Sequence, residues 1–222
     1  MHTKLQGMLT RAFLISLFTA VGFGVIALLV SQQKIAAFDL AIISAVQGLE
    51  SPGWTRFAIL LDKVGSTAFV PVITVVAGLY LYVVLKHRSE LVLLIAAIGG
   101  AALLNTILKK MFQRERPTLN IIMEETGFSF PSGHSMAGFA LYGILIFLLW
   151  KHIRSTAGRA ILLVLAGGMI LVMGISRIYL GVHYPSDVLG GFLASAFWLT
   201  VCIWTYQRYQ LKREQRTGRA QD

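Results

Sequence analysis

Long apolar stretches recur along the chain, and they constrain its fold more than any other feature of the sequence. The first stretch, residues 12–30, is almost continuously hydrophobic and is long enough to cross ~30 Å of hydrocarbon as a helix. Five further stretches follow it, separated by short polar or charged segments. The sequence therefore predicts an all-α, polytopic membrane protein, a bundle of six transmembrane helices at about residues 12–30, 66–85, 91–108, 135–150, 160–175 and 188–206.

The composition of the chain also favours a membrane location. Of its 222 residues, 56% are hydrophobic, and the mean hydropathy is +0.70. A soluble domain of this length could not bury so much apolar surface. Because the length suits one compact bundle, we expect a single integral-membrane domain over residues 1–222. The single cysteine, Cys202, lies in an apolar run, which excludes an intramolecular disulfide and predicts a packing role.

Two segments differ from the pattern of spanning helices. Residues 31–55 place apolar side chains at three- and four-residue steps from Ile35 to Leu49, with polar residues between them. This amphipathic pattern is compatible with a helix on the membrane surface and equally with a helix packed on the bundle. The tail, residues 207–222, is polar and basic, and we expect it to be frayed or disordered.

The basic residues predict how the chain is oriented. The net charge is +10 although only 14% of the residues are charged. In a membrane protein such an excess marks cytoplasmic loops that face anionic lipid, rather than nucleic-acid binding. An even number of spans places both termini on one side, and that side carries more lysine and arginine than the other. We therefore expect cytoplasmic termini and a cytoplasmic tail.

Three short polar segments stand out in the second half of the chain, at residues 109–117, 131–134 and 176–187. They bring the cations Lys109, Arg116 and Arg177 to the ends of predicted spans. Clustered cations repel one another, and an anion bound between them turns this repulsion into net attraction. Arginine and lysine both bind phosphate oxygens well. For any one of these residues alone, ordinary snorkelling at the interface is the stronger interpretation.

The second segment, Pro131-Ser132-Gly133-His134, directly precedes an apolar stretch. Ser132 is a good helix N-cap, and Gly133 lets backbone approach a ligand closely. The start of a helix presents N–H groups and the positive end of the dipole, which favour an anion. The alternative is a plain capped helix with a satisfied histidine.

The third segment pairs a histidine with a carboxylate. Asp187 follows His183 by four residues, at the start of the last predicted span. A carboxylate at that position can accept the Nδ1–H of the imidazole and leave Nε2 free as a nucleophile. A structural histidine–aspartate bond that holds a loop is equally compatible. The adjacent pair Glu124-Glu125 lacks histidines at metal-ligand spacing, so we expect no metal site. We expect the pair to lie on a solvated loop face, with contact to a lipid headgroup as the lesser alternative.

Taken together, the three segments resemble the three-part signature of the type-2 phosphatidic acid phosphatase superfamily, which includes vanadium haloperoxidases. The matching residues are Lys109, then Arg116-Pro117, then Pro131 to His134, then Ser176-Arg177, His183 and Asp187. The signature region, about residues 91–206, covers the later part of the chain, and the six-span layout agrees with the membrane branch of the family.

The resemblance implies a role for each matched residue. His183 is expected to attack phosphorus and form a phosphohistidine, Asp187 to orient His183, and His134 to act as general acid and then general base. The expected phosphate-binding residues are Lys109, Arg116, Ser132, Gly133 and Arg177. The family's reaction needs no metal and no cofactor.

The expected function is therefore that of a lipid phosphatase in a bacterial cytoplasmic membrane, with its active site on the extracytoplasmic side. Its partners are expected to be the bilayer and a lipid phosphate: phosphatidylglycerophosphate, undecaprenyl diphosphate or phosphatidic acid. We expect no nucleic acid and no obligate protein partner. Two alternatives stay open: a vanadate-dependent oxidant, and a transporter or scaffold that only binds anionic lipid.

Overall fold

The computed structural model describes residues 2–65 and 69–218, and every regular element in those residues is a helix. This confirms the predicted all-α class. The elements are α1 (His2–Ser31), α2 (Ala36–Gln47), α3 (Pro52–Val64), α4 (Phe69–Leu79), a π-helical turn (Tyr80–Val84), α5 (Arg88–Phe112), α6 (Gly133–Trp150), α7 (Thr156–Tyr179) and α8 (Pro185–Gly218).

Among the described residues, five helices are long and apolar enough to cross a membrane. They contain the predicted first, third, fourth, fifth and sixth spans, at Thr10–Ser31, Arg88–Phe112, Gly133–Trp150, Thr156–Tyr179 and Pro185–Gln215. The predicted second span, 66–85, corresponds to a shorter apolar helix, Phe69–Val84, and its first residues, 66–68, lie outside the described part of the chain. The chain is thus a multi-pass membrane protein, and the count of six spans is approximate.

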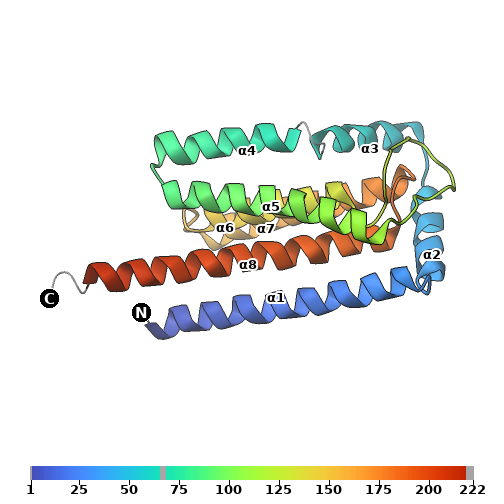
Figure 1. The fold of residues 1–222 in the computed structure, drawn as a ribbon. Coiled ribbons are helices and arrows are strands. Elements are labelled where there is room, and N and C mark those ends of the chain that lie inside the picture. Colours follow the sequence, from blue (N-terminus) through green and yellow to red (C-terminus); the bar gives the residue numbers. More distant parts are fainter. Residues whose placement is uncertain (1, 66–68, 219–222) are drawn as a thin grey trace.

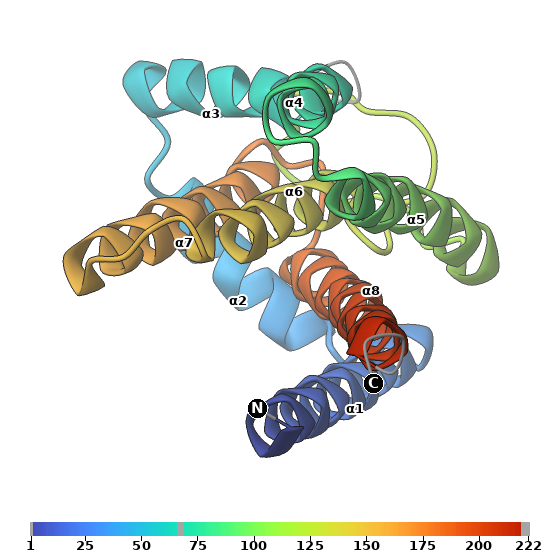
Figure 2. The same ribbon diagram turned by 90° about the vertical axis from the view of Figure 1, so that its left-hand side faces the viewer.

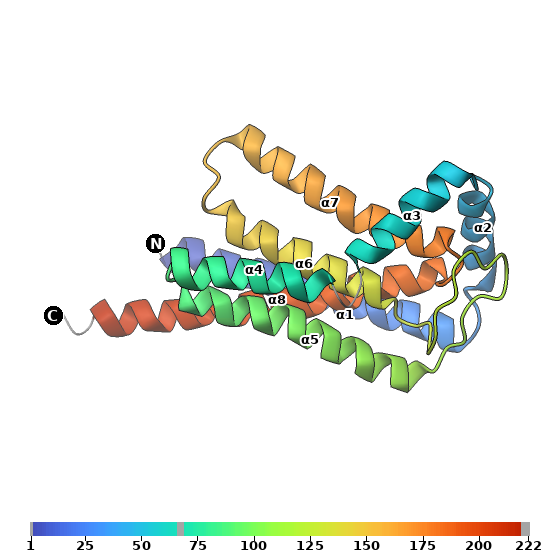
Figure 3. The ribbon, with the colours of Figure 1, turned by 90° about the horizontal axis from the view of Figure 1, so that it is seen from above.

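The long helices run roughly side by side, and both ends of the chain lie at the same end of the bundle (Figure 1). Helix α1 packs along α8 on one side of the molecule, and α3 and α4 lie on the opposite side (Figure 2). At the end away from the termini, α2 runs across the bundle axis, and α3 crosses α7 (Figure 3).

The bundle is held together by apolar side chains that face inward. One cluster joins the π-helical turn to α5, α6 and α8, and it includes Leu94, Ile144, Leu199 and the buried Cys202. Cys202 is therefore a packing residue, as predicted. Many other large apolar side chains point outward, as Phe18 on α1 does, which suits a bundle whose solvent is lipid.

The polar tail differs from its prediction. Helix α8 does not end near Tyr206 but continues to Gly218, so residues 207–218 are helical rather than frayed. Lysine, arginine, glutamine and glutamate are all good helix formers. Side chains one turn apart also support the helix: the Gln210 amide donates to the Tyr206 hydroxyl at 2.8 Å. Positions 219–222 lie outside the described residues.

The amphipathic segment is also placed by the structure. Helix α2 buries Ile43 against Ile178 of α7 and Val188 of α8, so it packs on the bundle. Its Asp39 is buried as well and joins a polar network described below. Phe38 and Leu40 remain exposed on its other face. Of the two interpretations of this segment, a helix packed on the bundle fits the face of α2 that contains Ile43 and Asp39.

Candidate active site

The three polar segments meet at the end of the bundle opposite the termini (Figure 1). Each predicted residue lies at or near the end of a long helix: Lys109 in the last turn of α5, Arg177 in the last turn of α7, and Asp187 in the first turn of α8. His183 lies in the connection from α7 to α8, and Arg116 in the long connection from α5 to α6.

His183 and Asp187 are both completely buried. The imidazole Nδ1 lies 3.5 Å from Asp187 Oδ2, close to the predicted geometry but long for a direct hydrogen bond. Ser129 fills the gap, since its hydroxyl donates to Asp187 Oδ2 and lies 3.4 Å from His183 Nδ1. Sequence analysis missed Ser129, which no spacing relation links to the histidine.

Burial lowers the pKa of His183 to about 4; Asp187 opposes this shift, and the cations Arg116 and Arg177 add to it. The ring is therefore neutral near pH 7. With Nδ1 toward the carboxylate, Nε2 is assigned as the unprotonated nitrogen, and it lies 3.3 Å from Arg116 Nη1. A neutral imidazole with an available Nε2 is the form in which histidine acts as a nucleophile.

Two arginines face this nitrogen. Arg116 is held by backbone carbonyls, donating to Val182 O at 2.8 Å and to Gly127 O at 2.9 Å. Arg177 is 1% exposed, and its guanidinium pairs with two carboxylates, those of Asp62 and Glu125. Such a buried, paired arginine is not a snorkelling side chain.

Glu125 corrects one prediction. It is not on a solvated loop face, because its carboxylate pairs with Arg177 and lies 3.3 Å from Arg116 Nη1 and 4.0 Å from His183 Nε2. Burial raises the pKa of Glu125, but Arg177, His183 and Arg116 outweigh it, and the net shift is downward. Its neighbour Glu124 is exposed, as expected. The Glu125 carboxylate thus occupies an oxyanion position between the two arginines.

The predicted cap is confirmed at the start of α6. Ser132 is buried at the N-cap, and its hydroxyl accepts hydrogen bonds from Ser135 N and Ser135 Oγ. A side chain on Gly133 would begin only 3.1 Å from Asn105 Oδ1, so the backbone sits tightly there. The Ser132 N–H donates to the Asp187 carbonyl at 3.0 Å, which joins the start of α6 to the start of α8.

His134 lies beside a carboxylate that sequence analysis did not find. Its Nε2 is 3.2 Å from Asp62 Oδ1, although the two are not aligned as a hydrogen bond. The pKa of Asp62 is lowered, through His134 first and then Arg177, against the opposing effect of burial. Asp62 lies in α3, far from the three segments in sequence, at the end of a short mixed stretch before the predicted second span.

A second polar network holds the site from outside. Arg114 donates to Asp187 Oδ1 at 2.7 Å and to Asp39 Oδ2 at 2.8 Å. Asp39 also accepts from the backbone N–H and the hydroxyl of Ser186. The network therefore ties α2 to the first turn of α8 and fixes the carboxylate beside His183. None of its contacts follows from the sequence pattern.

Lys109 is partly buried and close enough to Arg116 and Glu125 to interact with both electrostatically. All eight predicted site residues thus lie at one end of the bundle. In the part of the chain that the structure describes, no group of three histidine, cysteine or acidic side chains forms a metal-binding cluster.

Fold and site together define a class: a multi-pass helical membrane protein with a buried histidine beside a pair of arginines at one end of the bundle. Comparison with known families makes the class specific. Residues 90–211 match the family model of the PAP2 superfamily. The chain belongs to the PAP2 superfamily, the type-2 phosphatidic acid phosphatase family that its three motifs resemble.

Individual relatives agree. The chain is 32% identical to phosphatidylglycerophosphatase B of Bacillus subtilis over 77% of its own length and 84% of that protein. It is 30% identical to the putative undecaprenyl-diphosphatase YbjG of Escherichia coli over 70% of this chain and 76% of that one. The crystal structure of a transmembrane PAP2-type phosphatidylglycerolphosphate phosphatase from Bacillus subtilis superposes with a TM-score of 0.76 at 29% identity, covering 84% of this chain and 93% of that chain.

Proposed function

We propose that this protein removes a phosphate group from a lipid headgroup through a phosphohistidine on His183, at the extracytoplasmic face of a bacterial cytoplasmic membrane. Its class is that of its family: it is a membrane lipid phosphatase, a hydrolase of phosphate esters. The proposal adds the residue roles, the substrates and the orientation.

The position of the Glu125 carboxylate supports this proposal most directly. It bridges Arg116 and Arg177 and lies 4.0 Å from His183 Nε2. An anionic oxygen at that position would place the phosphorus of a phosphate within reach of a neutral imidazole nitrogen. The same two arginines would stabilise the charge that develops on the phosphoryl oxygens, joined by Lys109 and the start of α6 with Ser132 and Gly133.

In the proposed reaction, His183 Nε2 attacks phosphorus and the bond from phosphorus to the lipid oxygen breaks. His134 donates a proton to that leaving oxygen. Asp187, held by Ser129 and Arg114, lies on the Nδ1 side of the ring and balances the positive charge on the imidazole. Water then attacks the phosphohistidine while His134 takes up a proton, and inorganic phosphate leaves.

Glu125 must move before this can happen, because two anions cannot share the pocket between the arginines. It lies in the connection between α5 and α6 and its side chain is 28% exposed, so it has solvent on one side to move into. Substrate phosphate therefore competes with Glu125 for Arg116 and Arg177.

A lipid substrate fits the surroundings of the site. Arg177 and Asp187 lie in the end turns of spanning helices, at the level where headgroups meet the hydrocarbon. An apolar cavity of about 450 Å³ lies among α2, α3 and α7, and its wall includes Leu61 and Ser176, the chain neighbours of Asp62 and Arg177. We therefore propose lipids with long apolar chains, phosphatidylglycerophosphate and undecaprenyl diphosphate first and phosphatidic acid next.

The decisive experiment measures phosphate release from these three lipids by purified protein in detergent, with and without a chelator, beside the variant His183→Ala. We expect release by the parent protein and a loss of ~10³-fold or more in the variant, because a missing nucleophile cannot be replaced by binding alone. The melting temperature of the variant should stay close to that of the parent.

Turnover by His183→Ala at near-parental rate would remove His183 from the nucleophile role. Lipid binding without phosphate release by the parent would favour the transporter or scaffold alternative, and halide oxidation with added vanadate would favour the oxidant.

A further inference from the structure

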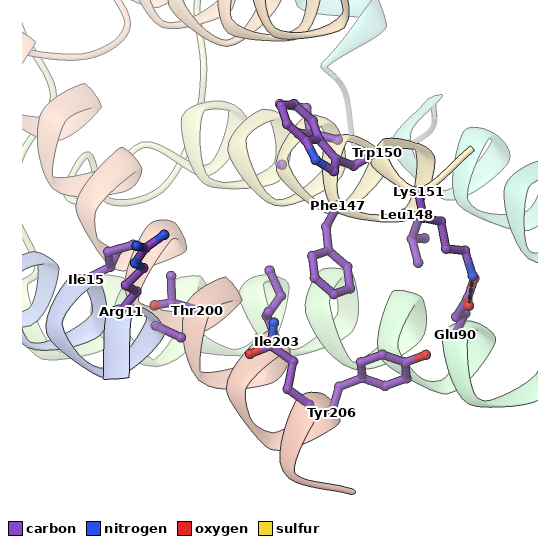
Figure 4. Close-up of a pocket in the computed structure, with 14 residues that line it drawn as sticks. Arg11, Ile15, Glu90, Phe147, Leu148, Trp150, Lys151, Thr200, Ile203 and Tyr206 are labelled. Atoms are coloured by element: carbon purple, nitrogen blue, oxygen red, sulfur yellow. Dashed lines mark hydrogen bonds and ion pairs between the residues drawn. The ribbon is translucent and has the colours of Figure 1, made fainter. Parts of the chain in front are cut away.

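A cavity of about 590 Å³ lies among α1, α5, α6 and α8, at the end of the bundle that carries the termini (Figure 4). Most of its wall is apolar, including Ile15, Phe147 and Ile203. Its volume is typical of ligand pockets rather than of packing defects. The phosphate site lies at the opposite end of the bundle, so this cavity belongs to neither the proposed reaction nor its substrate.

Charged side chains border the cavity. Figure 4 shows Arg11 on one side and Lys151 paired with Glu90 on the other. Glu90 is buried and also lies 3.2 Å from His87 Nδ1, so the charge of Lys151 is compensated. Arg11 has no ion pair or hydrogen bond with any residue that the structure describes. Among the side chains that the structure describes, Arg11 is thus a positive charge at the border of the cavity without an ion-pair partner.

Gln207 adds a second, independent feature. It lines the cavity from α8 and is 8% exposed. Its Oε1 atom is buried, and within residues 2–65 and 69–218 it accepts no hydrogen bond. Buried acceptors in folded proteins nearly always have a donor, so this oxygen calls for an O–H or N–H from a bound molecule.

The depth of the cavity indicates where such a molecule comes from. Arg11 lies at the start of the span Thr10–Ser31, and Trp150 and Lys151 lie at the end of the span Gly133–Trp150. Tryptophan and basic residues gather at this level, where lipid headgroups meet the hydrocarbon. From there the apolar wall continues inward past Ile15 and Gly143.

We propose that this cavity binds an anionic phospholipid with a hydroxylated headgroup. The phosphodiester lies at Arg11, a headgroup hydroxyl donates to Gln207 Oε1, and one acyl chain lies against Ile146 and Ile203. Basic pockets between transmembrane helices suit anionic headgroups, and the net positive border favours them over zwitterionic ones. The bound lipid fills the space between α1, α6 and α8 and stabilises their packing.

The test uses phosphatidylglycerol with a photoactivatable group in one acyl chain, added to the full-length protein in detergent. After illumination, mass spectrometry of peptides locates the label. We expect it in residues 143–151 or 200–207. The variant Arg11→Gln should reduce labelling there roughly tenfold, the usual worth of one charge-assisted hydrogen bond, and Gln207→Leu roughly fivefold, the worth of a neutral one. The matched control Arg154→Gln removes an exposed basic residue that does not line the cavity, and should label as the parent does.

A second measurement does not depend on crosslinking. Phosphatidylglycerol should raise the melting temperature of the parent and of Arg154→Gln more than that of Gln207→Leu at the same lipid concentration. Equal labelling by phosphatidylcholine or phosphatidylethanolamine would overturn the proposal. So would unchanged labelling in both cavity variants, or a label confined to the phosphate site.

Discussion

Individual side chains at the site are arranged so that opposite charges lie close together in a largely buried cluster. Arg177 is the clearest case, since its buried guanidinium pairs with Asp62 on one side and Glu125 on the other. Breaking a buried ion pair by removing one partner is costly, because the other charge stays unpaired. We therefore expect each of these carboxylates to affect catalysis through the arginine or histidine that it touches.

The lowered pKa of His183 predicts an unusual acid limb. The pKa falls from 6.5 to about 4, so Nε2 stays unprotonated until the pH nears that lower value. Below it, the imidazolium cannot attack phosphorus. We expect kcat/KM of the free enzyme to stay level through pH 6.5 and to fall only toward pH 4.

The measurement is kcat/KM on a soluble short-chain lipid phosphate between about pH 4 and pH 8, with tryptophan fluorescence reporting that the protein remains folded. An acid limb centred near 6.5 would mean that His183 titrates as an ordinary exposed histidine and would contradict the buried, neutral assignment.

Asp62 is predicted to position His134. The variant Asp62→Asn keeps the size of the side chain but removes the charge 3.2 Å from His134 Nε2. We expect kcat on lipid substrates to fall about tenfold or more, because proton transfer to the leaving oxygen becomes less efficient. A substrate with a good leaving group, such as nitrophenyl phosphate, should be affected much less. Equal losses on both substrates would indicate a structural role for Asp62 instead.

Among the helices, the site lies at helix ends, so the stabilising effect of an N-cap serine can be measured apart from any effect on catalysis. Ser132 caps α6 inside the site, whereas Ser155 caps α7 at the other end of the bundle, where its hydroxyl accepts from Gly158 N at 3.1 Å. We expect Ser132→Ala and Ser155→Ala each to lower the free energy of unfolding by about 1 kcal/mol.

These two variants should differ in activity. If Ser132 also helps to hold phosphate, Ser132→Ala lowers kcat/KM while Ser155→Ala leaves it at the parental value. Thermal unfolding in detergent and phosphate release give the two readouts. Equal activity of both variants would reduce Ser132 to a cap alone.

Helix α2 shows how a peripheral element supports the site. It is not a span, yet its Asp39 reaches Arg114 and Ser186, and through Arg114 it reaches the carboxylate beside His183. The apolar contact of Ile43 with Ile178 and Val188 presses the helix against α7 and α8. The position of Asp187 thus depends on α2, on the connection between α5 and α6 that carries Arg114, and on α8 itself.

The orientation of the bundle in the membrane can be tested by labelling engineered cysteines. The native Cys202 is first replaced by alanine, so that only engineered cysteines react. Thr118→Cys then reports on the end of the bundle that carries the site, and His152→Cys reports on the end that carries the termini. Both positions are exposed. We expect an impermeant maleimide added to intact cells to label position 118 and not position 152, because the larger share of basic residues stays cytoplasmic. The reverse pattern would place the active site in the cytoplasm.

Local patterns in the amino-acid sequence predicted the class of fold and most of the residues that meet at the site. Apolar stretches long enough to span a bilayer are local features, and so are the cap at Ser132 and the four-residue step from His183 to Asp187. Local patterns of this kind depend on neighbours in the chain and can be read without coordinates. The three motifs, in order, also indicated the family.

The groups that surround these residues follow from the folded bundle and not from local sequence. Asp62 meets Arg177 across 115 positions of sequence, Arg114 meets Asp39 across 75, and Glu125 turns inward where a solvated loop was expected. Such contacts arise because separate helices end at the same level of the bundle, and no periodicity records which ends become neighbours. The imidazole of His183 is kept neutral by burial and by two nearby arginines. This electrostatic environment is therefore a property of the folded bundle.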